Sequence, residues 1–86
     1  MKLLWTDRGW EDYLYWQQED KKTLKRINIL IADCLRNGAT GIGKPEPLKH
    51  DFAGAYSRRI NMQDRFVYVI HGDAIEILQC RWHYSD

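Results

Sequence analysis

Residues Tyr56 to Trp82, YSRRINMQDRFVYVIHGDAIEILQCRW, hold three runs rich in β-branched and aromatic residues, separated by two polar segments. Such runs favour strands, and short polar segments containing Asn, Asp and Gly favour the tight turns between them. We therefore predict an antiparallel meander of three strands over residues 56–60, 65–70 and 74–82.

The N-terminal part of the chain predicts a short strand, over residues 2–6, and two helices. Thr6 or Asp7 can cap the first helix, because either side-chain oxygen can accept a free first-turn amide. The spacing places a mostly apolar set of residues on one face, Trp10, Tyr13, Leu14 and Gln17, and turns the acidic residues Glu11, Asp12 and Glu19 away from it. A second helix begins at Asp20 and ends at Asn37-Gly38. Apolar residues recur in this helix at three- and four-residue steps and predict its buried face: Leu24, Ile27, Leu30, Ile31, Cys34 and Leu35.

The resulting element order is β-α-α-β-β-β. It predicts an α+β protein in which a helical hairpin packs on a mostly antiparallel sheet. Residues 38–47, GATGIGKPEP, form the one clear loop, because three glycines and two prolines cannot continue a helix or a central strand. At 86 residues, we expect one domain over residues 1–86.

Charge and cysteine content narrow the possible partners. The net charge is +1 and the isoelectric point is about 7.8, below the values above about 9 that mark an obvious nucleic-acid binder. Any basic site must therefore be local. The two cysteines are too few for a disulfide scaffold and match no zinc spacing, so we expect a cytoplasmic protein without metal or cofactor. The apolar runs are too short for a membrane span, and charge comes too early for a signal peptide.

The second half of the chain holds residues that together could cleave RNA through its own 2′-hydroxyl. That reaction needs a base for the hydroxyl proton, an acid for the departing 5′-oxygen, and cations for the charge on phosphate. The candidates are Glu46 as base, His83 as acid, Lys49, Arg59 and Arg65 as cations, and Tyr84 as a stacking surface.

Strand alternation suggests how these residues meet. Arg58 and Arg59 must point to opposite faces of their strand. Arg59 and Arg65 would lie opposite each other if Ile60 joins the turn, and a last strand continuing through Trp82 would carry His83 on the face of Ile75, Ile77, Gln79 and Arg81.

Ordinary structural interpretations remain open beside this one. Glu46 is also a plausible solvated loop carboxylate, and His83 a plausible surface histidine. Arg58 and Arg59 could form weak surface ion pairs with Asp51 and Asp64. Ile29 falls among charged residues and is either simply exposed or part of a subunit contact.

Four segments closely resemble the YoeB/Txe toxins of the RelE/ParE superfamily of toxin–antitoxin systems: Lys44–His50, Tyr56–Ile60, Arg65–Tyr68 and Cys80–Tyr84. Trp5 and residues Trp10–Gln17 also resemble the opening of that family, so the similarity covers essentially the whole chain. Two departures are Tyr56, where the family has Trp, and Ser85-Asp86, which extend beyond the usual terminal His-Tyr.

The resemblance implies a RelE-like fold of the microbial RNase type. It also implies a ribosome-dependent endoribonuclease that cleaves mRNA in the A site, inhibits translation and is neutralised by a cognate YefM-like antitoxin. Homodimers occur in the family. By likeness of position, Glu46 would be the general base, His83 the general acid and Arg65 the transition-state stabiliser. Lys49 and Arg59 would assist, and Tyr84 would position the substrate.

Two other functional classes remain possible from the sequence. One is a non-catalytic inhibitor of the same fold that binds a protein such as gyrase, as ParE-type relatives do. The other is a simple RNA- or ribosome-binding protein. Neither class needs the acid–base pair.

Overall fold

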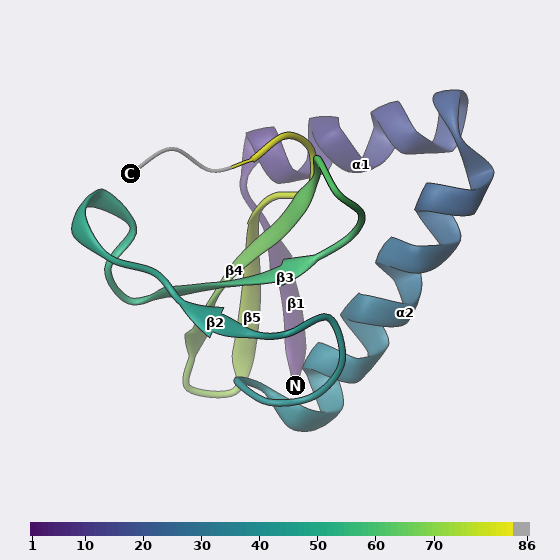
Figure 1. Ribbon diagram of the computed structural model, residues 1–86. Coiled ribbons are helices and arrows are strands. Elements are labelled where there is room, and N and C mark those ends of the chain that lie inside the picture. Colours follow the sequence, from purple (N-terminus) through teal and green to yellow (C-terminus); the bar gives the residue numbers. More distant parts are fainter. Residues whose placement is uncertain (84–86) are drawn as a thin grey trace.

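A computed structural model describes residues 1–83 and places two helices against one face of a five-stranded sheet (Figure 1). The elements are β1 (Lys2–Trp5), α1 (Asp7–Glu19), α2 (Lys21–Asn37), β2 (Glu46–Pro47), the 3-10 helix η1 (His50–Phe52), β3 (Ala55–Arg59), β4 (Arg65–His71) and β5 (Ala74–Gln79). The strand order is β1-β5-β4-β3-β2, with only β1 and β5 parallel. The predicted α+β class and mostly antiparallel sheet are thus confirmed.

The three C-terminal strands form the predicted meander. Arg59 pairs with Arg65, so Ile60 joins the turn between β3 and β4. That turn is closed by Asn61, whose side-chain oxygen accepts the backbone N–H groups of Gln63 and Asp64 at 2.9 and 2.7 Å. Side chains that hydrogen-bond to nearby backbone in this way stabilise a turn, which explains why the polar segment separates two strands.

A single residue, Asp20, separates the two helices of the hairpin. Its backbone N–H donates to Trp16 of α1, and its carboxylate accepts the backbone N–H groups of Lys22 and Thr23 in α2. Asp20 therefore ends one helix and caps the next. The predicted cap at Thr6 is also confirmed, because its hydroxyl accepts the N–H of Gly9 at 3.0 Å.

Helix α2 buries the predicted face, whereas the prediction for α1 was wrong. The buried residues of α1 are Gly9, Asp12 and Trp16, while Trp10 and Leu14 are exposed. The reason is a close approach of α1 to β5, since a Cβ atom at Gly9 would lie 2.4 Å from the Ile77 carbonyl oxygen. Only a small residue permits that contact at position 9, and the buried Asp12 carboxylate accepts the backbone N–H of Cys80 at 3.1 Å.

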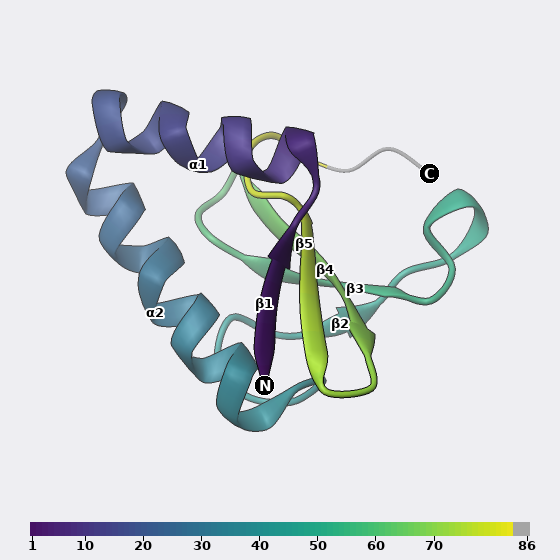
Figure 2. The ribbon, with the colours of Figure 1, turned by 180° about the vertical axis from the view of Figure 1, so that it is seen from behind.

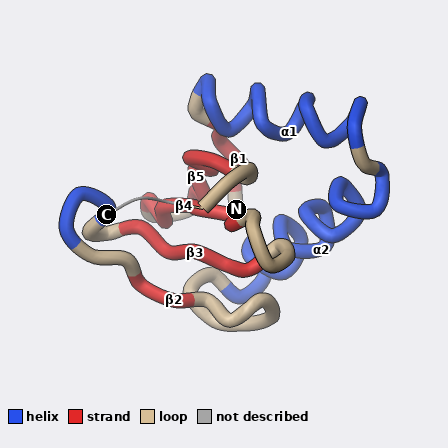
Figure 3. The backbone as a smooth tube through the Cα atoms, turned by 45° about the horizontal axis from the view of Figure 1, so that its top comes forward, coloured by secondary structure: helices blue, strands red, loops and turns tan. Residues whose placement is uncertain are grey.

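The apolar core is built from residues of the helices and the sheet, whose arrangement is seen from behind in Figure 2 and turned about the horizontal axis in Figure 3. Its members include Ile27, Leu30, Cys34, Phe66, Tyr68, Ile75, Ile77 and Cys80. Both thiols are buried and free, and burial raises the pKa of each. Both cysteines are thus members of the apolar core. Ile29 is exposed on α2.

The sheet differs from the prediction chiefly at the end of β5 and in an additional strand, β2, while the ends of β1, β3 and β4 shift by at most one residue. β5 ends at Gln79 rather than Trp82, because the following residues turn back toward the start of β4. β2 lies within the predicted loop and pairs Glu46 with Ser57 and Pro47 with Tyr56. It stands at the edge of the sheet, where a proline is tolerated in a strand. No helix within residues 1–83 is long and apolar enough to cross a membrane.

Candidate active site

Glu46, Arg59 and Arg65 lie on one face of the sheet, the face opposite the helices. The strand register shows this. Ser57 of β3 pairs with Glu46 of β2, and Arg59, two residues after Ser57, pairs with Arg65 of β4. Directly opposed residues, and residues two apart in a strand, point to the same face. Their placement follows from the register alone, and it confirms that Arg59 and the buried Arg58 point to opposite faces.

Arg65 is held at the turn that precedes it. Its Nη1 donates to the carbonyl oxygens of Asn61 and Asp64 at 2.8 and 3.1 Å. These bonds keep the guanidinium at the end of β4, beside the turn. Arg59 is exposed, and its backbone N–H donates to Gly43 at 2.7 Å.

The segment after β5 docks onto the same end of the sheet. The Trp82 N–H donates to Oδ1 of Asp64 at 2.7 Å, and the Trp82 carbonyl accepts the backbone N–H of Arg65 at 3.0 Å. His83 follows directly and is exposed. His83 therefore follows a segment whose backbone is hydrogen-bonded to Asp64 and Arg65, at the end of the sheet where β4 begins. We predicted that the last strand continues through Trp82 and carries His83 on the same face as Ile75 and Ile77. That prediction was wrong, because β5 ends at Gln79.

Asp64 is a residue that the sequence reasoning missed. It is 6% exposed and also accepts a hydrogen bond from the side-chain amide of Asn61 at 3.0 Å. The available signal was the polar Asn61-Met62-Gln63-Asp64 turn, in which two side chains can hydrogen-bond to backbone. No sequence pattern indicated that Asp64 would also receive the amide of Trp82.

Lys49 lies three residues after Glu46 and is exposed, just before η1. Its position depends on Leu48, whose N–H donates to the Ala55 carbonyl at 2.9 Å. Leu48 packs with Ala55 and Val67 in a small apolar cluster on the Glu46 face of the sheet. The segment that carries Glu46 and Lys49 is therefore fixed to β3. Tyr84 lies outside the described residues.

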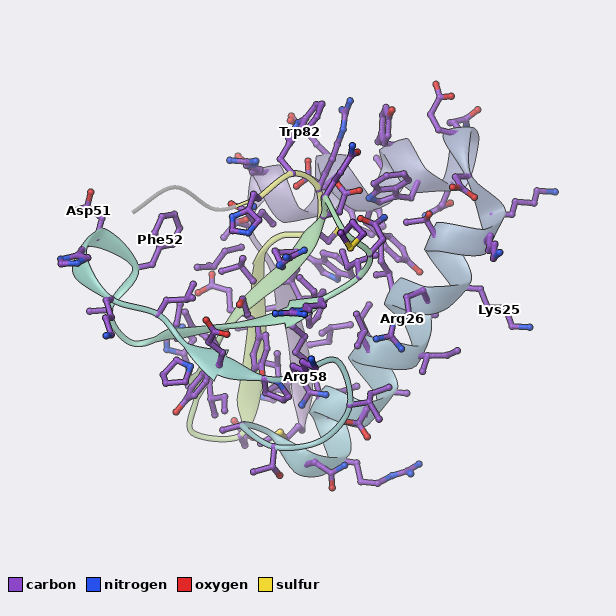
Figure 4. The ribbon with its side chains drawn as sticks, in the orientation of Figure 1. Lys25, Arg26, Asp51, Phe52, Arg58 and Trp82 are labelled. Carbon is purple, nitrogen blue, oxygen red and sulfur yellow. The ribbon has the colours of Figure 1, made fainter. Side chains whose placement is uncertain are left out.

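Arg58 holds the loop that leads to Glu46 and was also missed. Its side chain is fully buried and hydrogen-bonds to the carboxylate of Asp33, the hydroxyl of Tyr68 and three loop carbonyls, those of Gly38, Thr40 and Ile42. Figure 4 shows Arg58 beside the loop that follows α2. The predicted weak surface pairs with Asp51 or Asp64 were wrong. The apolar or aromatic residues at alternate positions, Tyr56 and Ile60, were the available signal that Arg58 points inward.

The charges of this network affect the protonation of Asp33. The hydrogen bond from the Arg58 guanidinium lowers the pKa of the Asp33 carboxyl, so this group is ionised at neutral pH. Oδ2 of Asp33 also accepts the backbone N–H of Ile42 at 3.1 Å. Asp33 thus ties α2 to the loop and, through Arg58, to β3.

The candidate site thus contains the Glu46 carboxylate and the Arg59 and Arg65 guanidinium groups on one face of the sheet. His83 follows the docked Trp82 at the end of the sheet where β4 begins. A carboxylate and an imidazole can exchange protons with substrate hydroxyls, and guanidinium groups can neutralise phosphate oxygens. Within residues 1–83, no cluster of three or more His, Cys, Asp or Glu side chains is placed to hold a metal ion.

Comparison with known proteins gives consistent results. A family model described as a YoeB-like toxin of bacterial type II toxin–antitoxin systems matches residues 5–84. Toxin YoeB of Escherichia coli (strain K12) is 51% identical over 84 residues, which cover 98% of this chain and all of the relative.

Solved structures agree with the sequence match. A YoeB/ParE toxin from Agrobacterium tumefaciens superposes with a TM-score of 0.94 at 49% identity, covering 98% of this chain and 100% of that chain. A YoeB dimer and a heterotetrameric YoeB–YefM complex from Staphylococcus aureus each match with a TM-score of 0.90 and 47% identity, over 98% of both chains. By family model, sequence and fold together, this chain belongs to the YoeB-like toxins of bacterial type II toxin–antitoxin systems.

Proposed function

We propose that this protein is a ribosome-dependent endoribonuclease that cleaves mRNA in the ribosomal A site and thereby inhibits translation. One observation carries the proposal. Glu46, Arg59 and Arg65 share one face of the sheet, and His83 directly follows Trp82, whose backbone docks beside Arg65 at one end of the sheet. Membership of the YoeB-like toxins supports the same choice of chemistry.

In the proposed reaction, Glu46 removes the proton from a ribose 2′-hydroxyl. The 2′-oxygen then attacks the adjacent phosphorus, and the bond from phosphorus to the 5′-oxygen breaks. His83, in its protonated form, gives its proton to that departing oxygen. The products are a 2′,3′-cyclic phosphate and a new 5′-hydroxyl end, so protons and bonds balance without a metal or cofactor.

The cations act on the phosphate. We assign Arg65 to the non-bridging oxygens as their charge grows in the transition state, with Arg59 and Lys49 assisting. Arg59 stands directly across from Arg65, which allows both to approach one phosphate group. A net charge of +1 gives weak general attraction for RNA. We therefore assign to the ribosome most of the work of presenting the mRNA strand.

The same proposal extends to protein partners. The Staphylococcus aureus relatives form a YoeB dimer and a YoeB–YefM complex. We propose that this chain likewise binds a YefM-like antitoxin and forms a homodimer. Copurification of a small antitoxin with the untagged chain, and the mass of each complex in solution, test these assignments.

The first prediction tests the acid and the base. Glu46→Gln and His83→Gln keep side-chain size but remove the proton acceptor and the proton donor. We expect each variant to lower the cleavage rate in a reconstituted translation reaction by about 10²- to 10⁴-fold, with ribosome binding retained. New 5′-hydroxyl mRNA ends, mapped by primer extension, provide the measurement.

Matched controls are Glu19→Gln and His71→Gln, which alter the same residue types away from the site and should cleave as the wild type does. Full cleavage by both Glu46→Gln and His83→Gln would show that the acid–base assignment is wrong. A wild-type protein that blocks translation or DNA supercoiling without producing new ends would instead support a non-catalytic inhibitor.

A further inference from the structure

Trp82 has an unusual backbone at the end of the candidate site. Its φ is 67°, in the left-handed region that large side chains rarely adopt. The conformation is held from both sides, because the Trp82 N–H donates to the buried Asp64 and the Trp82 carbonyl accepts from Arg65. Strain that the surroundings maintain in this way is typical of functional positions.

The Trp82 side chain is 54% exposed, in contrast to Trp16, which is buried in the core and donates to the Cys80 carbonyl. Figure 4 shows Trp82 at the end of the sheet where the chain turns back after β5. A large part of its indole surface is therefore accessible, one residue before the proposed acid His83.

A cation and a second ring support the indole. Cζ of Arg81 lies 4.5 Å from the centroid of the Trp82 ring and 3.5 Å from the centroid of the Tyr15 ring. Tyr15 belongs to α1, and its ring packs edge-on against Trp16 at a centroid distance of 5.0 Å. These three residues, Tyr15, Arg81 and Trp82, form what we call the Trp82 stack. It connects the exposed ring to the core, so the ring is ordered before any ligand arrives.

We propose that Trp82 is a stacking surface for one base of the mRNA strand, at a nucleotide next to the scissile phosphate. Unpaired bases of single-stranded RNA stack on exposed aromatic rings, and they do so with little dependence on sequence. The supporting Arg81 adds positive charge close to the strand. This inference rests on the proposed function, because it takes the Arg65 and His83 end of the sheet as the place where the phosphate is cleaved.

The test compares Trp82→Leu, which removes the ring, with Trp82→Phe, which keeps one. Both leave the backbone bonds to Asp64 and Arg65 available. Trp10→Leu is the matched control, since Trp10 is 45% exposed but lies on α1, where it packs against Trp5 and Tyr13. Ribosomes are programmed with mRNAs in which one A-site nucleotide at a time lacks its base. A 2′-deoxy group at the scissile nucleotide gives a matched set that cannot be cleaved.

We expect loss of one particular base to weaken wild-type binding to the uncleavable complex by about 5- to 150-fold, the usual effect of one stacked base. Trp82→Leu should show a similar loss with intact mRNA and no further loss with the abasic mRNA, because both changes remove the same contact. Trp82→Phe should retain most of the affinity, and Trp10→Leu should match the wild type.

The stacking role would be overturned if the wild-type affinity were the same for every abasic mRNA. It would also be overturned if Trp82→Leu lost further affinity on the abasic mRNA, so that the two losses add. If the wild type cleaves mRNA but the affinity losses caused by the missing base and by Trp82→Leu add, the proposed nuclease function stands and the stacking role falls. If the two losses coincide but no mRNA is cleaved, base stacking on Trp82 stands, whereas the nuclease function and the placement of that base next to a scissile phosphate both fall. A wild-type protein that binds none of these complexes overturns both.

Discussion

At the scale of single residues, Arg58 is the residue on which the loop before Glu46 depends. A guanidinium is tolerated without solvent contact only when its donors find acceptors. Arg58 finds them in the Asp33 carboxylate, the Tyr68 hydroxyl and three loop carbonyls. The loop has few apolar residues to pack, so these hydrogen bonds position it in place of a hydrophobic contact.

Acid titration should expose the contribution of Asp33. Its folded-state pKa is lowered, first by the hydrogen bond from Arg58, below an unfolded value of about 3.9. The stabilisation is therefore complete above that unfolded value and is lost as the pH falls through the folded pKa. We expect the free energy of unfolding of the wild type to decrease more steeply below about pH 4 than that of Asp33→Asn. Urea unfolding across an acidic pH series provides the measurement.

Asp51→Asn is the matched control, because it changes the net charge equally at an exposed position on η1. It should keep the wild-type dependence on pH. Identical acid slopes for Asp33→Asn and the wild type would show that the Arg58–Asp33 contact adds nothing to stability.

At the scale of elements, the turn between β3 and β4 and the segment after β5 form one unit. Asp64 closes the turn through Asn61 and also receives the Trp82 N–H. The side-chain amide of Gln79 donates to the carbonyl of Arg81 at 3.2 Å. The chain after β5 thus has an ordered path although it belongs to no strand.

Asp64 should act as a positioning residue for His83. Asp64→Ala removes the acceptor of the Trp82 N–H, whereas Asp64→Asn retains a side-chain oxygen at the same place. We expect Asp64→Ala to lower the cleavage rate on the order of 10²-fold with KM little changed, because a small displacement of an acid is costly in rate. Asp64→Asn should retain most of the rate.

Amide hydrogen exchange gives a readout that does not depend on activity. The Trp82 amide should exchange slowly in the wild type and in Asp64→Asn, and rapidly in Asp64→Ala. If Asp64→Ala keeps both slow exchange at Trp82 and the full cleavage rate, Asp64 does not position this segment.

At the scale of the whole molecule, charge is balanced overall and concentrated locally. Lys49, Arg59 and Arg65 are the cations that we assign to RNA phosphates. If they make three phosphate contacts, the logarithm of the affinity for single-stranded RNA should fall against the logarithm of salt concentration with a slope of about −2. Titration of the Glu46→Gln variant, which we expect to cleave slowly, with an oligoribonucleotide at several salt concentrations measures this slope.

Arg59→Gln should make the slope shallower by about 0.7, the value for one phosphate contact to a single strand. Arg36→Gln, an exposed change on α2, should leave it unchanged. A slope near zero for the parent variant would contradict direct phosphate contacts by these residues.

Local sequence signals predicted a large part of this molecule. The periodic apolar face of α2, the pairing of Arg59 with Arg65 and the order of the main elements all depend on neighbours in sequence. Contacts between distant residues decided the rest. The inward face of α1 depends on the close approach of Gly9 to Ile77, and the end of β5 depends on Asp64, far from it in sequence. The roles of Glu46, Lys49, Arg65 and His83 remain predictions, which family resemblance suggested more specifically than residue chemistry did.

The parallel pairing of β1 with β5 has a consequence for the synthesis of the protein. Within the described chain, the strand partner of residues 2–5 is residues 74–77, and the amide of Cys80 bonds to Asp12 in the first helix. These contacts cannot form until residues 74–80 have left the ribosome that makes them. β1 and α1 therefore remain without these partners until β5 and Cys80 have emerged. A protein proposed to attack ribosomes therefore cannot pair its first strand until its last described strand has left the ribosome that produced it.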